Sequence, residues 1–78
     1  MKVIEESGIR EYLQKRQITE AYCKQKTLIE SGYFDVVELK KMKPKTAGIV
    51  YFRITKKYRA IGFIEGEILV VTKIWDHQ

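Results

Sequence analysis

The change of hydrophobic period at Gly32 constrains the fold of this chain more than any other feature of its sequence. Between Ile9 and Ser31 there is neither glycine nor proline, and apolar residues recur at the spacing of one helix face. After Gly32, apolar residues alternate with polar ones or form β-branched runs, which is typical of strands. We therefore expect an N-terminal helical part followed by a sheet.

The element boundaries follow from breaks in these patterns. Two helices are predicted between residues 9 and 31, with a break near Gln17–Thr19. Strands are predicted at Val36–Met42, Ile49–Thr55, Tyr58–Ile64 and Glu67–Trp75, and a short edge strand at Lys2–Glu5. Residues 43–48 read as a loop, and Glu65-Gly66 favours a tight hairpin turn. The expected fold is α+β, with two N-terminal helices packed on a mostly antiparallel sheet of four to five strands.

The length of one hairpin loop decides where two arginines point. If residues 55–57 form a three-residue loop, Arg53 lies opposite Arg59 and both point away from the helices. The residues that would then face the helices are Phe52, Ile54, Tyr58 and Ala60. A two-residue loop would place the arginines on opposite faces. Like charges that lie opposite each other in a sheet repel, so two arginines on one face favour a site where both bind an anion. A phosphate is suited to such a site because guanidinium groups donate paired hydrogen bonds to it. The plainer interpretation is that each arginine pairs with a surface carboxylate.

Positive charge is concentrated in the second half of the chain. The length of 78 residues suggests one small domain, spanning residues 1–78. Its net charge is +5. Residues 1–39 hold six Lys or Arg against seven Asp or Glu, whereas residues 40–78 hold nine against three. Eight of these cations lie between Lys40 and Arg59 with no acid among them, interleaved with aromatic residues. This segment is expected either to attract a polyanion or simply to form a solvated edge.

Several functional classes are disfavoured by composition. One cysteine, Cys23, and one histidine, His77, leave no Cys/His zinc site or internal disulfide within the chain. No long apolar run or signal-peptide pattern occurs, so we expect a cytosolic protein without a membrane span. Cys23 is expected in the core rather than as a nucleophile. Trp75 is expected in the core at the sheet end, or else stacked on a nucleic-acid base.

The residues from Gly48 to His77, with Val37–Lys41 before them, carry a resemblance to a known family. They resemble the RelE/ParE superfamily of toxins from type II toxin–antitoxin modules. Val37–Lys41 looks like the superfamily's x-Leu-Lys-Gly strand, and Tyr58-Arg59 matches its Tyr/His-Arg signature. The spacing from Arg53 through Arg59 to His77 is similar to the YoeB-like branch, which cleaves messenger RNA on the ribosome. The resemblance implies a cytoplasmic toxin that needs no cofactor and is neutralised by an antitoxin protein.

The resemblance also implies roles for individual residues. Arg53 and Arg59 match arginines that contact the scissile phosphate, and His77 matches the general acid for the leaving 5′ oxygen. The family's general-base glutamate falls at Val37, whereas this chain has Glu38 immediately before Leu39, so Glu38 is the candidate base. Gln78 stands where the family has a tyrosine. Candidate RNA-binding residues are Lys40, Lys41, Lys56, Lys57, Tyr58 and Lys73.

Two other functions stay open at this point. A ParE-like protein would bind DNA gyrase and leave RNA uncut, so His77 would be dispensable. A degenerate, non-catalytic relative would only bind a protein or RNA partner. The glutamate and tyrosine positions, Val37 and Gln78, are the sequence features that favour these alternatives.

Overall fold

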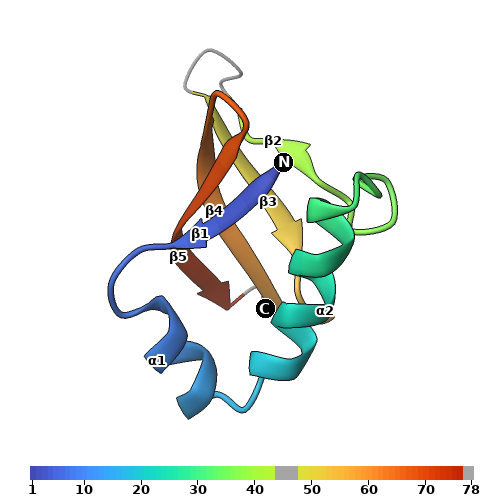
Figure 1. The fold of residues 1–78 in the computed structure, drawn as a ribbon. Helices are drawn as coiled ribbons and strands as arrows, with labels where there is room; N and C mark the ends of the chain where they lie inside the picture. Colours follow the sequence, from blue (N-terminus) through green and yellow to red (C-terminus); the bar gives the residue numbers. More distant parts are fainter. Residues whose placement is uncertain (44–47, 77–78) are drawn as a thin grey trace.

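Residues 1–43 and 48–76 are described in a computed structural model of the chain, and they form two helices and five strands (Figure 1). In chain order the elements are β1 (Lys2–Glu5), α1 (Ile9–Lys15), α2 (Thr19–Glu30), β2 (Lys40–Lys41), β3 (Ile49–Arg53), β4 (Tyr58–Glu65) and β5 (Ile68–Asp76). Most of the predicted 43–48 loop, together with His77 and Gln78, lies outside the described residues. The α+β prediction is confirmed.

The five strands form a single mixed sheet in the order β1-β5-β4-β3-β2. Strand β1 lies at the edge, as predicted, and runs parallel to β5, whereas the remaining neighbours are antiparallel. The β4–β5 pairing shifts register between Ile61 and Gly62. A Cβ at Gly62 would meet the Val70 carbonyl group, with its carbon at 2.8 Å, so this irregularity needs glycine.

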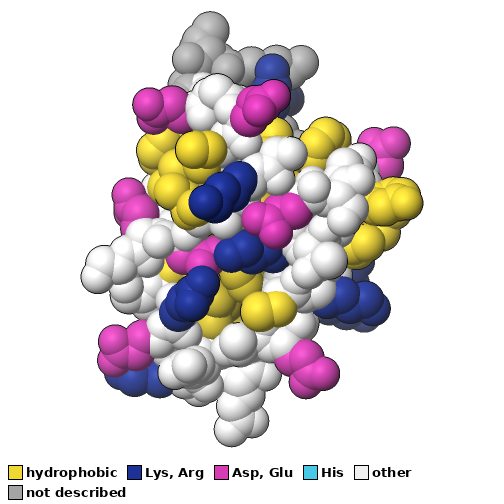
Figure 2. Space-filling view, viewed as in Figure 1, with side chains coloured by type: hydrophobic (Ala, Val, Ile, Leu, Met, Phe, Trp, Pro, Cys, Tyr) yellow, Lys and Arg dark blue, Asp and Glu magenta, His cyan; other side chains and the backbone are white. Residues whose placement is uncertain are grey.

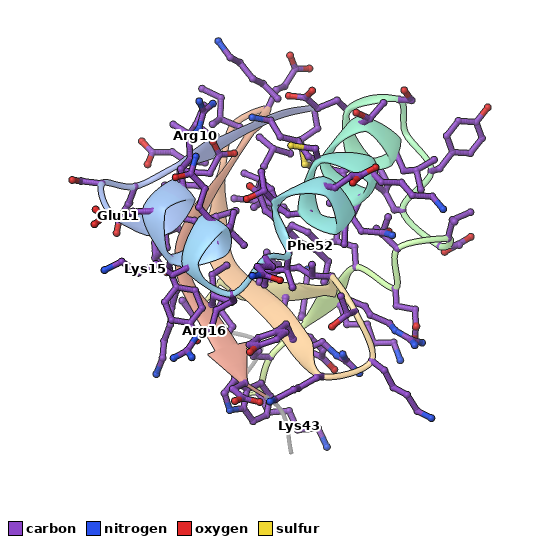
Figure 3. All side chains as sticks on the ribbon, turned by 90° about the horizontal axis from the view of Figure 1, so that it is seen from below. Arg10, Glu11, Lys15, Arg16, Lys43 and Phe52 are labelled. Carbon is purple, nitrogen blue, oxygen red and sulfur yellow. The ribbon has the colours of Figure 1, made fainter. Side chains whose placement is uncertain are left out.

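Both helices contribute to one core against one face of the sheet. The buried residues are Val3, Ile9, Leu13, Ile18, Tyr22, Ile29, Val37, Val50, Phe52, Ile54, Tyr58, Ala60, Leu69, Val71 and Ile74. Phe52 lies in the layer between helices and strands, where its ring centroid is 6.1 Å from that of Tyr22 (Figure 3). The helices separate at Gln17, whose φ of 59° is left-handed, so the predicted break near Gln17–Thr19 is confirmed.

A buried carboxylate ties β1 to both helices. The side chain of Glu5 is 5% exposed and accepts hydrogen bonds from Tyr22 Oη at 2.7 Å, Lys26 Nζ at 2.9 Å and Arg10 Nε at 3.1 Å. Burial alone would raise the pKa of Glu5, but these three donors outweigh it and lower that pKa. For Tyr22, burial and the bond to Glu5 raise the pKa of the phenol. Figure 2 shows basic and acidic side chains next to one another on the face of the molecule where β1 lies in front in Figure 1.

Three expectations differ from the structure. Strand β2 spans only Lys40–Lys41 rather than Val36–Met42, because the chain turns through residues 35–38 before it reaches the sheet edge. Cys23 is exposed on α2 rather than in the core, since the buried side of that helix is formed by Tyr22 and Ile29. Trp75 is 39% exposed on the opposite face of the sheet from the core. Among the described residues, the helices are too short and too polar to span a bilayer.

Candidate functional site

The β3–β4 hairpin places Arg53 and Arg59 opposite each other on the face of the sheet away from the helices. The pairing register joins Phe52 to Ala60 and Arg53 to Arg59. Phe52, Ile54, Tyr58 and Ala60 are all buried against the helices, as the three-residue loop predicts. We call the opposite side of the sheet, which carries Arg53 and Arg59, the open face.

Thr55 determines the shape of the loop between these strands. The Ile54 amide donates to the Tyr58 carbonyl at 3.0 Å, which closes the loop. The Thr55 hydroxyl accepts hydrogen bonds from the Lys57 amide at 3.2 Å and the Tyr58 amide at 3.1 Å. A threonine side chain that caps the backbone in this way stabilises a tight turn. The register that pairs the arginines therefore has a local cause.

The repulsion between the two guanidinium groups is relieved by separate acceptors. Nη1 of Arg59 donates to the carbonyl oxygens of Thr55 at 2.7 Å and of Lys56 and Tyr58 at 3.3 Å each. Nη1 of Arg53 instead lies 3.5 Å from the Glu38 carboxylate. That ion pair is long, and both side chains are nearly half exposed, so it is worth less than about 1 kcal/mol. An incoming anion can replace it at little cost.

The backbone of Glu38 explains how its carboxylate reaches Arg53. Its φ of 57° lies in the left-handed region, which is uncommon for a residue with a side chain. The Glu38 amide bonds to the Asp35 carbonyl at 3.2 Å, and the neighbouring Val37 is 1% exposed in the core. Strand alternation predicts opposite faces for Val37 and Glu38. In the structure these residues belong to a turn instead of a strand, with Val37 buried in the core and Glu38 beside Arg53.

These residues surround a hollow of about 250 Å³ lined by Glu38, Lys40, Tyr51, Arg53, Arg59 and Trp75. We call it the arginine pocket. It holds three cationic residues and one carboxylate, with Tyr51 and Trp75 as aromatic walls. Guanidinium groups offer planar, directional donors to a phosphate, and aromatic rings offer stacking surfaces for bases. The composition is therefore suited to a phosphate diester that bears an aromatic base.

The other predicted site residues are distributed around this pocket. Lys40 lines it from β2, whereas Lys41 pairs with the buried Val50 and is the next residue along that short strand. Lys73 is exposed on β5, two residues before Trp75. Lys56 and Lys57 are exposed in the hairpin loop, and Lys57 Nζ lies 3.8 Å from Asp76. His77 lies outside the described residues, so its position relative to the pocket stays a prediction.

Tyr58 is the candidate whose placement differs most from an RNA-contacting role. It is 9% exposed and belongs to the core cluster on the helix side of the sheet. Lys57 Nζ lies 5.5 Å from the centre of its ring. Alternation along β4 gives the physical reason, because Tyr58 and Arg59 are adjacent and must point to opposite faces.

Tyr51 is not among the site residues that the sequence predicts, and for Trp75 the structure excludes the core and leaves the alternative of stacking on a base. The rule that pairs the arginines also finds Tyr51, but it does not find Trp75. Pairing counted without interruption from Glu65 and Ile68 would place Ile74 opposite Arg59, and the register shift between Ile61 and Gly62 places Trp75 there instead. Tyr51 precedes Arg53 by two residues and therefore shares its face, and Trp75 lies opposite Arg59 on β5. Within the described ranges 1–43 and 48–76, no cluster of three or more His, Cys, Asp or Glu could hold a metal ion.

Comparison with known proteins supports the fold. Neither family models nor curated proteins match the sequence. Among solved structures, the chain is similar to a YoeB/ParE toxin from Agrobacterium tumefaciens, with 20% sequence identity, a TM-score of 0.66 and full coverage of both chains. At this level of identity the likeness concerns the fold. The chain therefore has the RelE/ParE-like toxin fold that the sequence resemblance implied.

Proposed function

We propose that this protein is the toxin of a type II toxin–antitoxin system and acts in the cytoplasm as a metal-independent endonuclease on ribosome-bound messenger RNA. The observation that carries the proposal is the pairing of Arg53 with Arg59 on the open face. The fold likeness supports a toxin, and the arginine pocket supports chemistry on a phosphate diester. The Arg/Arg/His spacing of the sequence favours the nuclease branch.

The proposed reaction uses the nucleophile that RNA already carries. The 2′ oxygen attacks the adjacent phosphorus, and the bond from phosphorus to the 5′ oxygen breaks. A base must accept the proton of the 2′-hydroxyl, and an acid must donate a proton to the leaving oxygen. The products are a 2′,3′-cyclic phosphate and a 5′-hydroxyl. The transition state carries extra negative charge on the phosphate, which positioned cations stabilise.

The described residues can be assigned to these steps. Arg53 and Arg59 are proposed to bind the phosphate. The guanidinium of Arg59 is held in place by its hydrogen bonds to three backbone carbonyl groups of the hairpin. Glu38 is the proposed base, because its carboxylate is 48% exposed and lies beside Arg53, where the 2′-hydroxyl of a bound nucleotide could reach it. His77 is the proposed acid on the sequence resemblance alone. Trp75 is proposed to stack on a base next to the scissile phosphate.

The test is a cell-free translation reaction dosed with purified protein, in which transcript 5′ ends are mapped by primer extension. Wild type should give ribosome-dependent cuts, and Arg59→Ala should lower the cleavage rate by about 10²–10³, as for other donors to an oxyanion. Arg59→Lys should recover little, because lysine lacks the planar donor set. Lys24→Ala is the matched control, since it removes one charge from the exposed side of α2. His77→Ala tests the proposed acid.

Intact transcripts with normal translation would refute the nuclease. Inhibition of gyrase supercoiling that tolerates His77→Ala would then support the ParE-like function. The absence of both activities in a folded protein would leave a non-catalytic binding protein. Cuts that persist in Arg59→Ala at the wild-type rate would separate any nuclease activity from the arginine pocket.

A further inference from the structure

Strand β1 forms one edge of the sheet that the described residues build, so one side of its backbone faces outward. On its inner side, the amides of Lys2 and Glu6 donate to carbonyl groups just before and within β5, at 2.9 and 3.0 Å. Because backbone amides alternate in direction along a strand, the amides of Val3 and Glu5 point away from the sheet. Such an outward row of amide and carbonyl groups can pair with another strand.

The carboxylate of Glu30 occupies one of these outward positions. Its Oε2 accepts a hydrogen bond from the Val3 amide at 3.0 Å, across 27 residues of sequence. Glu30 is the last residue of α2, and Figure 1 shows this end of the helix beside the start of β1. The carboxylate oxygen therefore lies where a carbonyl oxygen of an added strand would have to bind.

The helix itself gives no reason for an acid at this position. The C-terminal end of a helix carries partial negative charge, so a carboxylate in the last turn is unfavourable and a cation is favoured there. Within α2, whose residues are all described, the last turn ends on Glu30 and holds no basic side chain. The hydrogen bond to the Val3 amide supplies the reason that the helix lacks.

Space for a second strand lies along the same edge. A hollow of about 420 Å³ is lined by all four residues of β1 together with Arg10, Lys26 and Glu30. Val3 is buried beneath the helices, whereas Ile4 is 38% exposed on the opposite face of the sheet. The helices thus leave the outer side of β1 accessible, and the Glu30 side chain reaches its backbone.

The strand β1 is able to pair with a second copy of itself. If two copies lie antiparallel with their Ile4 residues opposite each other on a twofold axis, Val3 of each copy lies opposite Glu5 of the other. Both residues direct their backbone groups outward, so the two pairs would exchange four hydrogen bonds. The same register brings the two exposed Ile4 side chains together on one face. This pairing needs the Val3 amide, which Glu30 already binds.

We propose that Glu30 guards the β1 edge: by binding the Val3 amide, it prevents β1 of a second copy from pairing there and keeps the chain monomeric. The excluded partner is a copy of this chain, because the antiparallel register satisfies the outward groups of both strands at once. The negative charge of the carboxylate also repels the carbonyl oxygens of an approaching strand. The inference is independent of the proposed nuclease function, since it involves none of the residues that line the arginine pocket.

The test is sedimentation equilibrium of the purified full chain over a wide range of concentrations. Glu30→Ala removes the acceptor, whereas Glu30→Gln keeps a side-chain oxygen that can accept from the Val3 amide. Glu20→Ala is the matched control, because it removes the same charge from an exposed acid of the same helix. A double variant, Glu30→Ala with Ile4→Lys, places like charges opposite each other at the twofold axis of the excluded dimer. Thermal melting checks that each variant is folded.

Wild type, Glu20→Ala and Glu30→Gln should sediment as monomers of 9.2 kDa. Glu30→Ala should associate to twice that mass at least about tenfold more strongly than wild type, and the double variant should return to monomers. A folded Glu30→Ala that stays monomeric would overturn the proposal, and so would a wild-type dimer. Association of Glu30→Gln as strong as that of Glu30→Ala, or a dimer that Ile4→Lys leaves intact, would overturn it as well.

Hydrogen exchange of wild type tests the guard without any variant, so the proposal can be refuted even if Glu30→Ala does not fold. The Val3 amide should exchange more slowly than the Glu5 amide, which points outward in the same way, because Glu30 binds the former. Exchange of Val3 as fast as that of Glu5 in the folded protein would contradict the proposal.

Discussion

Substitution of Glu38 by glycine and by alanine provides a direct test of the backbone geometry at the arginine pocket. Both variants remove the carboxylate and its 3.5 Å contact with Arg53, so that loss cancels when the two are compared. What differs is the response to a φ of 57°. Alanine in the left-handed region is strained by about 1–2 kcal/mol, whereas glycine is not.

An opposing effect arises in the unfolded chain. Glycine has more conformational freedom there, which lowers the stability of the glycine variant by about 0.4–1 kcal/mol relative to alanine. The balance leaves the glycine variant more stable by roughly 0.5–1 kcal/mol. For a domain of this size, such a difference raises the melting temperature by about 2–8 °C.

The free energies of unfolding would be measured by urea titration followed by circular dichroism, with equal slopes required of both variants. Lys24, exposed within α2, supplies the matched control pair. At that helical position the order should reverse, with the alanine variant more stable than the glycine variant by about 1 kcal/mol. If alanine at position 38 equals or exceeds glycine in stability, the left-handed turn that brings Glu38 to Arg53 is refuted.

Three further predictions concern the supports of the site and the fold. Because the pKa of Glu5 is lowered in the folded protein, its ionised carboxylate stabilises the fold above the ordinary carboxylate range, and this contribution is lost as the pH falls through the folded-state pKa. Glu5→Gln should therefore lower the free energy of unfolding by about 1–3 kcal/mol at neutral pH. In urea titrations between pH 7 and 3, the stability of this variant should fall less steeply with decreasing pH than that of wild type. Thr55→Val should lower the free energy of unfolding by about 1–2 kcal/mol, and it should slow transcript cleavage because the loop carbonyls that hold Arg59 lose their fixed positions. Thr55→Ser keeps the hydroxyl and should behave like wild type in both measurements. Equal behaviour of the two variants would contradict the role of the hydroxyl. Gly62→Ala should destabilise by at least about 1–3 kcal/mol, because its methyl group meets the Val70 carbonyl on the neighbouring strand; a wild-type melting temperature would contradict that close approach.

The arginine pair shows how far local sequence rules reach. Alternation along β3 and β4 predicted Arg53 opposite Arg59 if the loop had three residues and on opposite faces if it had two, and the structure has the first arrangement. The same rule would have added Tyr51 to the site, whereas Trp75 lies opposite Arg59 only because the β4–β5 register shifts between Ile61 and Gly62. The relations among Tyr51, Arg53 and Arg59 depend on a periodicity of two, which can be read from the chain, and on the length of one loop, which the sequence left open.

Glu38 shows where such rules end. Strand alternation through residues 36–42 predicted that Glu38 would face away from the position of the family's glutamate. The structure has a turn there, in which Val37 is buried in the core and Glu38, with a left-handed φ of 57°, lies beside Arg53. The cost of that conformation is repaid by packing against strands and helices far away in the sequence, which no local pattern records.

The sequence by itself determined the order of helices and strands and the basic second half, since each depends on residues close together in the chain. It left the register of the β3–β4 hairpin between two loop lengths, and the structure decided it. Only the tertiary structure decided that β1 pairs in parallel with β5, that Glu5 is buried under donors from both helices, and that Glu38 meets Arg53. The physical reason is that, apart from the Glu5–Arg10 bond, these contacts join residues 15 to about 66 positions apart, and their free energies depend on the packing of the whole core.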